Sequence, residues 1–234
     1  MPEGLLHPSL ARLKRIAIAL GDLSSTVVFV GSSLAPILQL APPFEESRQT
    51  KDADAVVPTA SYSKTQALYE ELIRKGFRQD PADGAHVHRW HSPDNDLFDL
   101  VPAGRHLSSS GQQWDEIAIT TSEVFDLGDG VAIRHASATA FLAQKWAAFR
   151  DRGAADPFRS DDLEDILALV ASRPDIAAEL TAAEPDLRNY VRDQTRLFLT
   201  DARLADLLAG HLNTAENAAA AIVVARRRLE AIAA

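Results

Sequence analysis

The stretch "TKDADAVVP", residues 50–58, places two aspartates at alternate positions at the start of a short apolar run. This run predicts a β-strand. Because side chains alternate between the two faces of a strand, Asp52 and Asp54 are expected on the same face. A second D-x-D pair occurs at Asp94 and Asp96 in this aspartate-rich chain, so the motif alone is uninformative. The first pair is either a metal site or two solvated acids at a strand start, and its surroundings decide between the two.

The sequence around this pair predicts further strands and helices. Residues 25–31, "STVVFVG", predict a buried strand that ends at Gly31, and Ser32 and Ser33 suit the start of a short helix. Residues 8–20 and 63–75 have the spacing of amphipathic helices. Two more strands are expected on either side of the turn "SPDND" at 92–96, and a hairpin is expected over 122–137. Together these segments predict a small mixed β-sheet with flanking helices.

The pattern changes after Ser137, where the sequence becomes rich in alanine, leucine and charged residues. Helices are expected over residues 138–150, 160–171, 174–182, 184–199 and 213–232. A sheet with helices followed by a helical half indicates the α+β class. We therefore predict two domains, an α/β core over 1–136 and a helical domain over 137–234.

Composition limits the possible functions. The 234 residues contain no cysteine, which excludes disulfides and thiolate metal sites, and 46% of them are apolar, as in ordinary globular proteins. No apolar run is long enough to span a bilayer, and the N-terminus lacks the order of a signal peptide, so no membrane partner and a cytoplasmic location are expected. The formal charge of −9 argues against a broad nucleic-acid surface. Basic clusters at residues 12–15 and 226–228 are interpreted as solvated helix faces.

A third candidate carboxylate is Asp99, which lies in the apolar run "LFDLVP". An unpaired carboxylate among such residues would be costly, which favours Asp99 over Asp96 as the partner of Asp52 and Asp54. Three converging carboxylates repel one another unless a divalent cation lies between them, and ligands that are all oxygen suit Mg²⁺. The N–H groups of a glycine-serine turn at a helix start are suited to phosphate oxygens.

The order of these motifs resembles the polymerase-β-like nucleotidyltransferase superfamily, at Gly31, Ser32, Asp52, Asp54 and Asp99. The stretch "FLAQKWAAFRDRGAADPFRSDDLEDILALV", residues 141–170, resembles the lysine helix and the following acidic helix of the AbiEii/MenT-type nucleotidyltransferase toxin family. This resemblance implies that Lys145 contacts the triphosphate of a bound nucleotide. It also implies that Asp162 or Asp165 completes the site, so that the helical domain contributes to it.

The resemblance also implies an activity and partners. The expected reaction is Mg²⁺-dependent transfer of NMP from an NTP to an acceptor hydroxyl, with release of pyrophosphate. A cognate antitoxin and a tRNA acceptor are implied by the toxin relatives. An alternative is the same chemistry on a small molecule such as an antibiotic, which the acidic charge fits better. A further alternative is a catalytically inactive module of the same fold that binds another protein.

Several candidate residues also have a purely structural interpretation. Lys145 could lay its stem along the core and reach solvent. Asp162 and Asp165 could be acids near a helix start, with Ser160 as the cap. Residues 150–152, Arg-Asp-Arg, could form an ion-pair cluster or contact phosphate. His86 and His88 could bind zinc from one strand face, but solvent-facing histidines without metal are favoured because no further ligand is evident.

Overall fold

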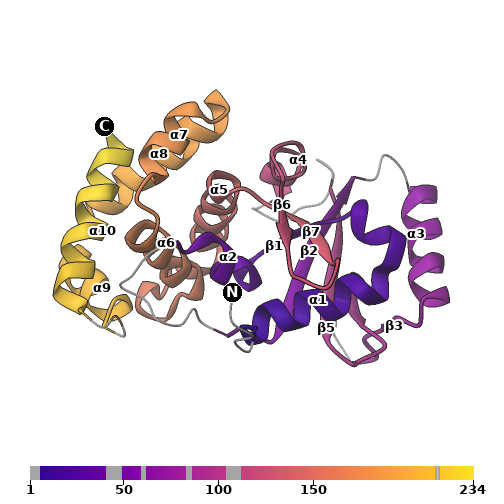
Figure 1. Cartoon of the computed structure of the whole chain (residues 1–234). Helices are drawn as coiled ribbons and strands as arrows, with labels where there is room; N and C mark the ends of the chain where they lie inside the picture. Colours follow the sequence, from indigo (N-terminus) through magenta and orange to yellow (C-terminus); the bar gives the residue numbers. More distant parts are fainter. Residues whose placement is uncertain are drawn as a thin grey trace. The chain divides into compact units, whose positions relative to one another are not determined.

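The computed structural model describes residues 6–40, 49–58, 62–82, 86–103, 112–213, 215 and 217–234. The chain divides into two compact units (Figure 1). The first unit takes the described residues up to 36 and those of 49–103 and 115–136. The second unit takes residues 37–40 and 112–114 and the described residues from 137 onward. The domain boundaries given above stay a prediction.

The first unit is built on a mixed seven-stranded sheet of order β3-β4-β5-β2-β1-β7-β6. The strands are β1 (Val28–Val30), β2 (Asp52–Pro58), β3 (Arg78–Gln79), β4 (Arg89–His91), β5 (Leu97–Ala103), β6 (Glu123–Asp126) and β7 (Ala132–His135). β2 lies between β1 and β5, antiparallel to β1 and parallel to β5. The predicted α+β class with a mixed sheet is therefore confirmed.

Both predicted hairpins are present. β4 and β5 pair antiparallel across the turn at residues 92–96, and β6 and β7 pair across the turn at 128–130. In the first turn Asn95 has a positive φ of 65°, a conformation that asparagine tolerates better than most residues. The two-residue strand β3 pairs with β4 and was not predicted, because so short a segment has no periodicity to read.

Three helices of the first unit are α1 (Pro8–Leu20), α3 (Tyr62–Arg74) and α4 (Asp115–Thr120). α1 and α3 confirm the predicted amphipathic helices. Pro8 opens α1 at a position where a missing N–H costs nothing, and the helix ends at Gly21. The apolar face of α1 is buried as its spacing predicts, at Leu10, Leu13, Ile16, Ala17 and Leu20. The short helix α4, which the sequence did not predict, packs against β1 and β2.

β1 is shorter than the seven residues predicted for it. Residues 21–25 form a 3₁₀ turn instead, and the Ser25 and Thr26 hydroxyls donate back to the carbonyls of Asp22 and Leu23. Such local bonds compete with strand pairing. The three residues that remain in β1 are all buried, which places its end in the centre of the unit.

The second unit is helical. Its helices are α5 (Ala138–Ala148), α6 (Asp161–Ser172), α7 (Ile176–Ala182), α8 (Pro185–Leu199), α9 (Leu204–His211) and α10 (Ala218–Ala233). α5 packs against α6 and α8, and α10 packs against α6 and α8. Trp146 of α5 is buried against Phe149 and Phe198. The packing of Trp146 against these two rings holds α5 in one orientation about its axis and so determines which of its faces contacts α6.

Two features of the second unit differ from the prediction. α9 was not predicted, although Leu204, Leu207 and Leu208 have helical spacing and are buried. α10 begins at Ala218 rather than 213, because the Asn217 side chain accepts a hydrogen bond from the Ala220 N–H and caps the helix there. Across the part of the chain that the structure describes, no helix has the length and apolar character needed to cross a membrane.

Candidate functional site

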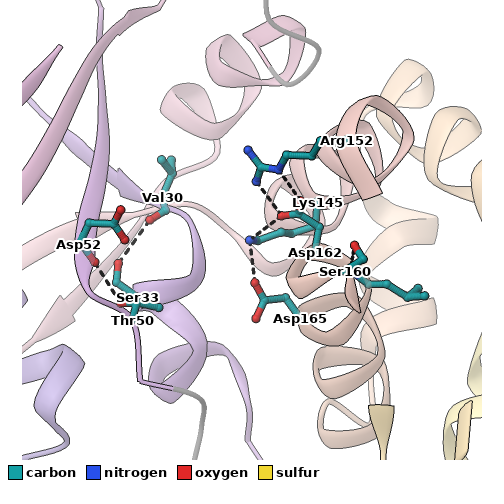
Figure 2. Close-up of polar contacts among 10 residues, drawn as sticks. Val30, Ser33, Thr50, Asp52, Lys145, Arg152, Ser160, Asp162 and Asp165 are labelled. Carbon is teal, nitrogen blue, oxygen red and sulfur yellow. Dashed lines mark hydrogen bonds and ion pairs between the residues drawn. The ribbon is translucent and has the colours of Figure 1, made fainter. Parts of the chain in front are cut away.

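The first feature of the site is the turn that follows β1. Gly31 has a φ of 75°, which side chains rarely adopt, and is followed by a 3₁₀ turn over Ser32–Leu34 and by α2 (Ala35–Leu38). The Ser33 hydroxyl donates to the Val30 carbonyl at 3.4 Å (Figure 2). A Cβ atom on Gly31 would lie only 2.3 Å from Oδ2 of Asp54. Backbone conformation and the close carboxylate therefore both require glycine at this position.

The second feature is the start of β2. Asp52 and Asp54 are half-buried, while Ala53 and Ala55 between and after them are fully buried. The Thr50 hydroxyl donates to the Asp52 carbonyl at 3.0 Å and fixes the entry of the strand (Figure 2). Strand alternation thus places both carboxylates on one face of the sheet, while the small apolar residues pack on the other.

Asp99 joins them from the neighbouring strand. β5 runs parallel to β2 in a register that pairs Asp54 with Asp99. One carboxylate oxygen from each of Asp52, Asp54 and Asp99 lies within 4.8 Å of the other two. We call these three residues the carboxylate cluster. The structure brings together the three acids that the sequence pointed to, and their roles stay predictions.

Arg89 also lies at this cluster, although the sequence did not point to it. Its Nε donates to Oδ1 of Asp99 at 2.8 Å and its Nη2 to Oδ2 at 2.7 Å, a bidentate pair. Nη2 also lies 3.4 Å from Oδ2 of Asp52. The hydrogen bonds to Asp99, with the charges of Asp99 and Asp52, raise the pKa of Arg89 above its ordinary value. The predicted hairpin carried a signal for this contact, since pairing across the turn at 92–96 places Arg89 opposite Asp99.

The chemistry of the carboxylate cluster suits a hard divalent cation. Its donors are all oxygen, and their mutual distances are short enough for a single ion to touch more than one of them. The side chains are partly buried, with 35% of Asp52 and 14% of Asp99 exposed. The cluster therefore keeps access to solvent, through which an ion and further ligands can enter. The residues present fit Mg²⁺ or Mn²⁺.

The histidines near this cluster do not form a metal site among the described residues, where the carboxylate cluster is the one group with ligand spacing. His86 and His88 precede β4, so the expectation that they share a strand face is wrong. The Nδ1 of His88 is 2.6 Å from the hydroxyl of Tyr69. Burial lowers the pKa of His88, which favours the neutral ring. The Nε2 of His91 lies 3.6 Å from Asp80.

In the second unit, Lys145 is buried, with 9% of its side chain exposed. Its Nζ lies 3.1 Å from Oδ1 of Asp162 and 2.6 Å from Oδ2 of Asp165 (Figure 2). Burial opposes the charge of Lys145, but the two carboxylates outweigh it and raise the pKa of Lys145. The lysine therefore stays charged inside the unit and does not reach for solvent. Its contact with a triphosphate stays a prediction.

Arg152 completes this group. Its Nε and Nη2 donate to the two oxygens of Asp162 at 2.8 Å and 3.0 Å. Burial would raise the pKa of Asp162, but the hydrogen bond from Arg152 and the charges of Lys145 and Arg152 lower it overall. We call Lys145, Arg152, Asp162 and Asp165 the buried ion-pair network; Lys145 and the two aspartates are buried, whereas 70% of the Arg152 side chain is exposed. The network contains two cations and two carboxylates, so its charges balance.

The structure also shows the contacts of Ser160, Arg150 and Arg152, for which the sequence left more than one role open. Ser160 caps α6, since its hydroxyl accepts a hydrogen bond from the Leu163 N–H at 3.2 Å. Arg150 donates to Oε1 of Gln194, while Arg152 belongs to the network. Gly153 approaches Ser160 so closely that a Cβ atom would lie 2.3 Å from the hydroxyl oxygen. The chain between α5 and α6 is therefore tightly fitted around the network.

Comparisons with known proteins give no family. No family model matches the chain, and no curated protein matches it. An antigenic nucleotidyltransferase-like protein from Paracoccidioides brasiliensis is similar at 16% identity, 79% coverage of this chain, 92% of that chain and a TM-score of 0.48. JHP933 from Helicobacter pylori is similar at 15% identity, 97% and 94% coverage and a TM-score of 0.47. At TM-scores below 0.5, these similarities do not bear on what this chain binds or does.

Proposed function

We propose that this chain is a Mg²⁺-dependent nucleotidyltransferase that moves NMP from an NTP to an acceptor hydroxyl and releases pyrophosphate. The observation that carries the proposal is the carboxylate cluster, in which oxygens of Asp52, Asp54 and Asp99 lie within 4.8 Å of one another. A second observation supports it, because the turn at Gly31 has no side chain and brings its backbone against Asp54. Phosphoryl-transfer sites commonly combine such acids with a glycine turn.

In this proposal the residues of the first unit have separate roles. Asp52 and Asp54 hold the metal ions, and Asp99 binds a second ion and helps to orient or deprotonate the acceptor hydroxyl. The N–H groups at Gly31 and Ser32 position phosphate oxygens. Bound Mg²⁺ would supply charge neutralisation for the attacking and leaving oxygens of an in-line displacement. Three carboxylates facing a triphosphate would otherwise repel it, so the metal is a requirement of the chemistry and not an accessory.

The direct test is calorimetric titration of the protein with each NTP in the presence and absence of Mg²⁺. The proposal predicts binding that requires Mg²⁺ and disappears in Asp52→Asn/Asp54→Asn. The matched control is Asp94→Asn/Glu123→Gln, which removes the same charge from two exposed positions of the first unit and should bind as the wild type does. No binding of any NTP by folded wild-type protein would refute the proposal and favour the inactive protein-binding module.

The proposed reaction needs an acceptor hydroxyl, and two kinds of acceptor are candidates. The resemblance to AbiEii/MenT-type toxins supports tRNA or protein as the acceptor and a cognate antitoxin as a partner. The formal charge of −9 favours a cationic small molecule such as an antibiotic. Basic residues are also committed to internal contacts, since Arg15 pairs with Asp96 and Lys14 with Asp129, and Arg228 donates to the Val170 carbonyl. We therefore keep the small-molecule acceptor as the second candidate.

Labelled NTPs separate these candidates. The protein is incubated with Mg²⁺, each α-labelled NTP and either total tRNA or a panel of aminoglycosides, and the label is followed into the acceptor. Label in tRNA that Asp52→Asn/Asp54→Asn abolishes supports the toxin-like reaction. Label in the drug supports the second candidate. Label in neither, from protein that binds Mg²⁺ and NTP, would leave a protein acceptor to be tested by label on co-incubated proteins.

A further inference from the structure

Two charged motifs of the sequence, the basic cluster at residues 12–15 and the second D-x-D pair, meet in the first unit. The Nε and Nη2 of Arg15 donate to the two carboxylate oxygens of Asp96 at 2.8 Å and 2.7 Å. The Nε of Arg12 lies 3.5 Å from Oδ1 of the same carboxylate, of which only 11% is exposed. These contacts join α1 to the turn at 92–96, which leads directly into β5.

Arg12 also contacts the segment that enters β2. Its Nη1 donates to the Thr50 carbonyl at 2.5 Å. The Thr50 hydroxyl donates in turn to the Asp52 carbonyl, at the first residue of β2 (Figure 2). Arg12 is no solvated side chain, since only 19% of it is exposed. One guanidinium therefore holds both the entry of β2 and the turn before β5, and its planar fork of donors suits such a bridge.

These two segments lead into the strands that carry the carboxylate cluster. β2 and β5 run parallel, and their first residues, Asp52 and Leu97, pair with each other. The starts of both strands therefore lie at one edge of the sheet, with Asp54 and Asp99 two residues further along. A metal site needs its ligands held in place by the residues around them. Arg12 contacts the chain where the separation of the two strands is set.

We propose that Arg12 is a positioning residue for the carboxylate cluster. From α1 it holds the starts of β2 and β5 together, so that the three carboxylates converge before a metal binds. A divalent cation then binds more tightly, because it does not have to order the two strand starts itself. This effect on metal binding rests on the proposed function, whereas the positioning of the strands does not require a metal.

The test makes two measurements on the full chain, comparing Arg12→Met with the wild type. Amide hydrogen exchange without metal, followed by nuclear magnetic resonance, should become faster at residues 52–54 and 97–99 than at the other strand amides of the same variant. Calorimetric titration with Mn²⁺ alone should show a dissociation constant raised on the order of tenfold. Removing a positive charge would by itself strengthen cation binding, so weaker binding is the signature of lost positioning.

The matched control is Lys14→Met, on the same helix. Lys14 Nζ contacts the Leu127 carbonyl at 3.1 Å and Oδ2 of Asp129 at 2.6 Å, at the turn between β6 and β7 and not at the acid-bearing strands. The variant loses the same charge and two contacts of α1, but should leave both measurements as in the wild type. If Arg12→Met does not fold, Arg12→Lys keeps the charge without the fork and should also weaken Mn²⁺ binding.

Hydrogen exchange decides the inference, and Mn²⁺ binding by the wild type decides the proposed function. Exchange at the two strand starts that is unchanged in the Arg12 variants, or changed equally in Lys14→Met, would overturn the inference even if the wild type binds Mn²⁺. Faster exchange with unchanged Mn²⁺ affinity would overturn the effect on metal binding and leave the proposed function standing. No Mn²⁺ binding by folded wild type would refute the metal site of the proposed function, and exchange alone would then decide whether Arg12 holds the strands.

Discussion

The two units of the chain each contain a cluster of charged residues, and the clusters differ in balance and burial. In the carboxylate cluster of the first unit, three acids lie together, Arg89 contacts Asp52 and Asp99, and the side chains stay partly exposed. In the buried ion-pair network of the second unit, two acids face two cations, and Lys145, Asp162 and Asp165 are buried. Acids that lie together within reach of solvent are suited to a cation, whereas in a buried ion-pair group the loss of one partner destabilises the fold, because a charge is left buried without compensation. Acidic residues in the sequence do not reveal which of the two they form.

The largest expected effect comes from unbalancing the buried ion-pair network. Lys145→Met leaves Asp162 and Asp165 buried with one cation fewer, so the free energy of unfolding should fall by about 3–5 kcal/mol. Denaturant unfolding followed by circular dichroism measures it. Arg227→Met, at an exposed position on α10, is the control and should cost less than about 0.5 kcal/mol. A comparably small cost for Lys145→Met would show that the network does not stabilise the second unit.

The next effect tests the turn beside the carboxylate cluster. Gly31→Ala introduces a Cβ atom into a backbone with φ of 75°, 2.3 Å from Oδ2 of Asp54. Gly130→Ala is a closely matched control, since Gly130 has the same φ of 75° and nothing lies within 4 Å of its Cβ position. Gly130→Ala should cost about 1–2 kcal/mol of stability, from backbone strain alone. Gly31→Ala should cost more and should abolish Mn²⁺ binding. Equal effects of the two on stability, with Mn²⁺ binding retained, would contradict the assigned role of the turn.

A pH effect follows from the lowered pKa of Asp162. A carboxyl with a depressed folded pKa stabilises the fold above its unfolded value, here 3.8, and that stability is lost as the pH falls through the folded pKa. The unfolding free energy of the wild type should therefore exceed that of Asp162→Asn at pH 7 by about 2 kcal/mol, the range of hydrogen bonds to charged groups. The difference should shrink as the pH is lowered below 3.8. A difference that does not change between pH 7 and pH 3 would mean that ionisation of Asp162 is not what stabilises the network.

The smallest effect distinguishes two arginines that are two residues apart. Arg150 is exposed and donates to the neutral Gln194, so Arg150→Met should change the unfolding free energy by less than about 0.5 kcal/mol. Arg152→Met leaves the buried Asp162 with one cation fewer and should cost more, about 1 kcal/mol. Thermal unfolding of the two variants side by side makes the comparison. Equal costs would place Arg152 outside the network in solution.

Much of the fold could be predicted from local patterns. Periodicity located the long helices and both hairpins, because these depend on residues close in sequence. The alternation "DADAV" placed Asp52 and Asp54 on one face for the same reason. Short elements such as β3 and the shortened β1 depend on pairing and on side-chain bonds to the backbone, which periodicity does not reveal.

The partners of the charged residues could be predicted only in part. The contact of Arg89 with Asp99 could have been predicted, because the register of a hairpin follows from its turn and pairs these two residues. The enclosure of Lys145 was not, because it depends on the packing of α5 against α6 and on the π-helical turn at Phe149–Gly153 that carries Arg152 to Asp162. The spacing of Asp162 and Asp165 predicted that they share one helix face, but it did not predict which residues contact that face.

The most direct test of the account is the position of a bound metal in crystals soaked with Mn²⁺, located by anomalous scattering. The account predicts a peak at coordinating distance from carboxylate oxygens of Asp52 and Asp54, about 2.1 Å, and none beside Asp162 and Asp165. A peak in the buried ion-pair network, or no peak at the carboxylate cluster in crystals that take up Mn²⁺ elsewhere, would contradict the distinction between the two clusters and with it the proposed site.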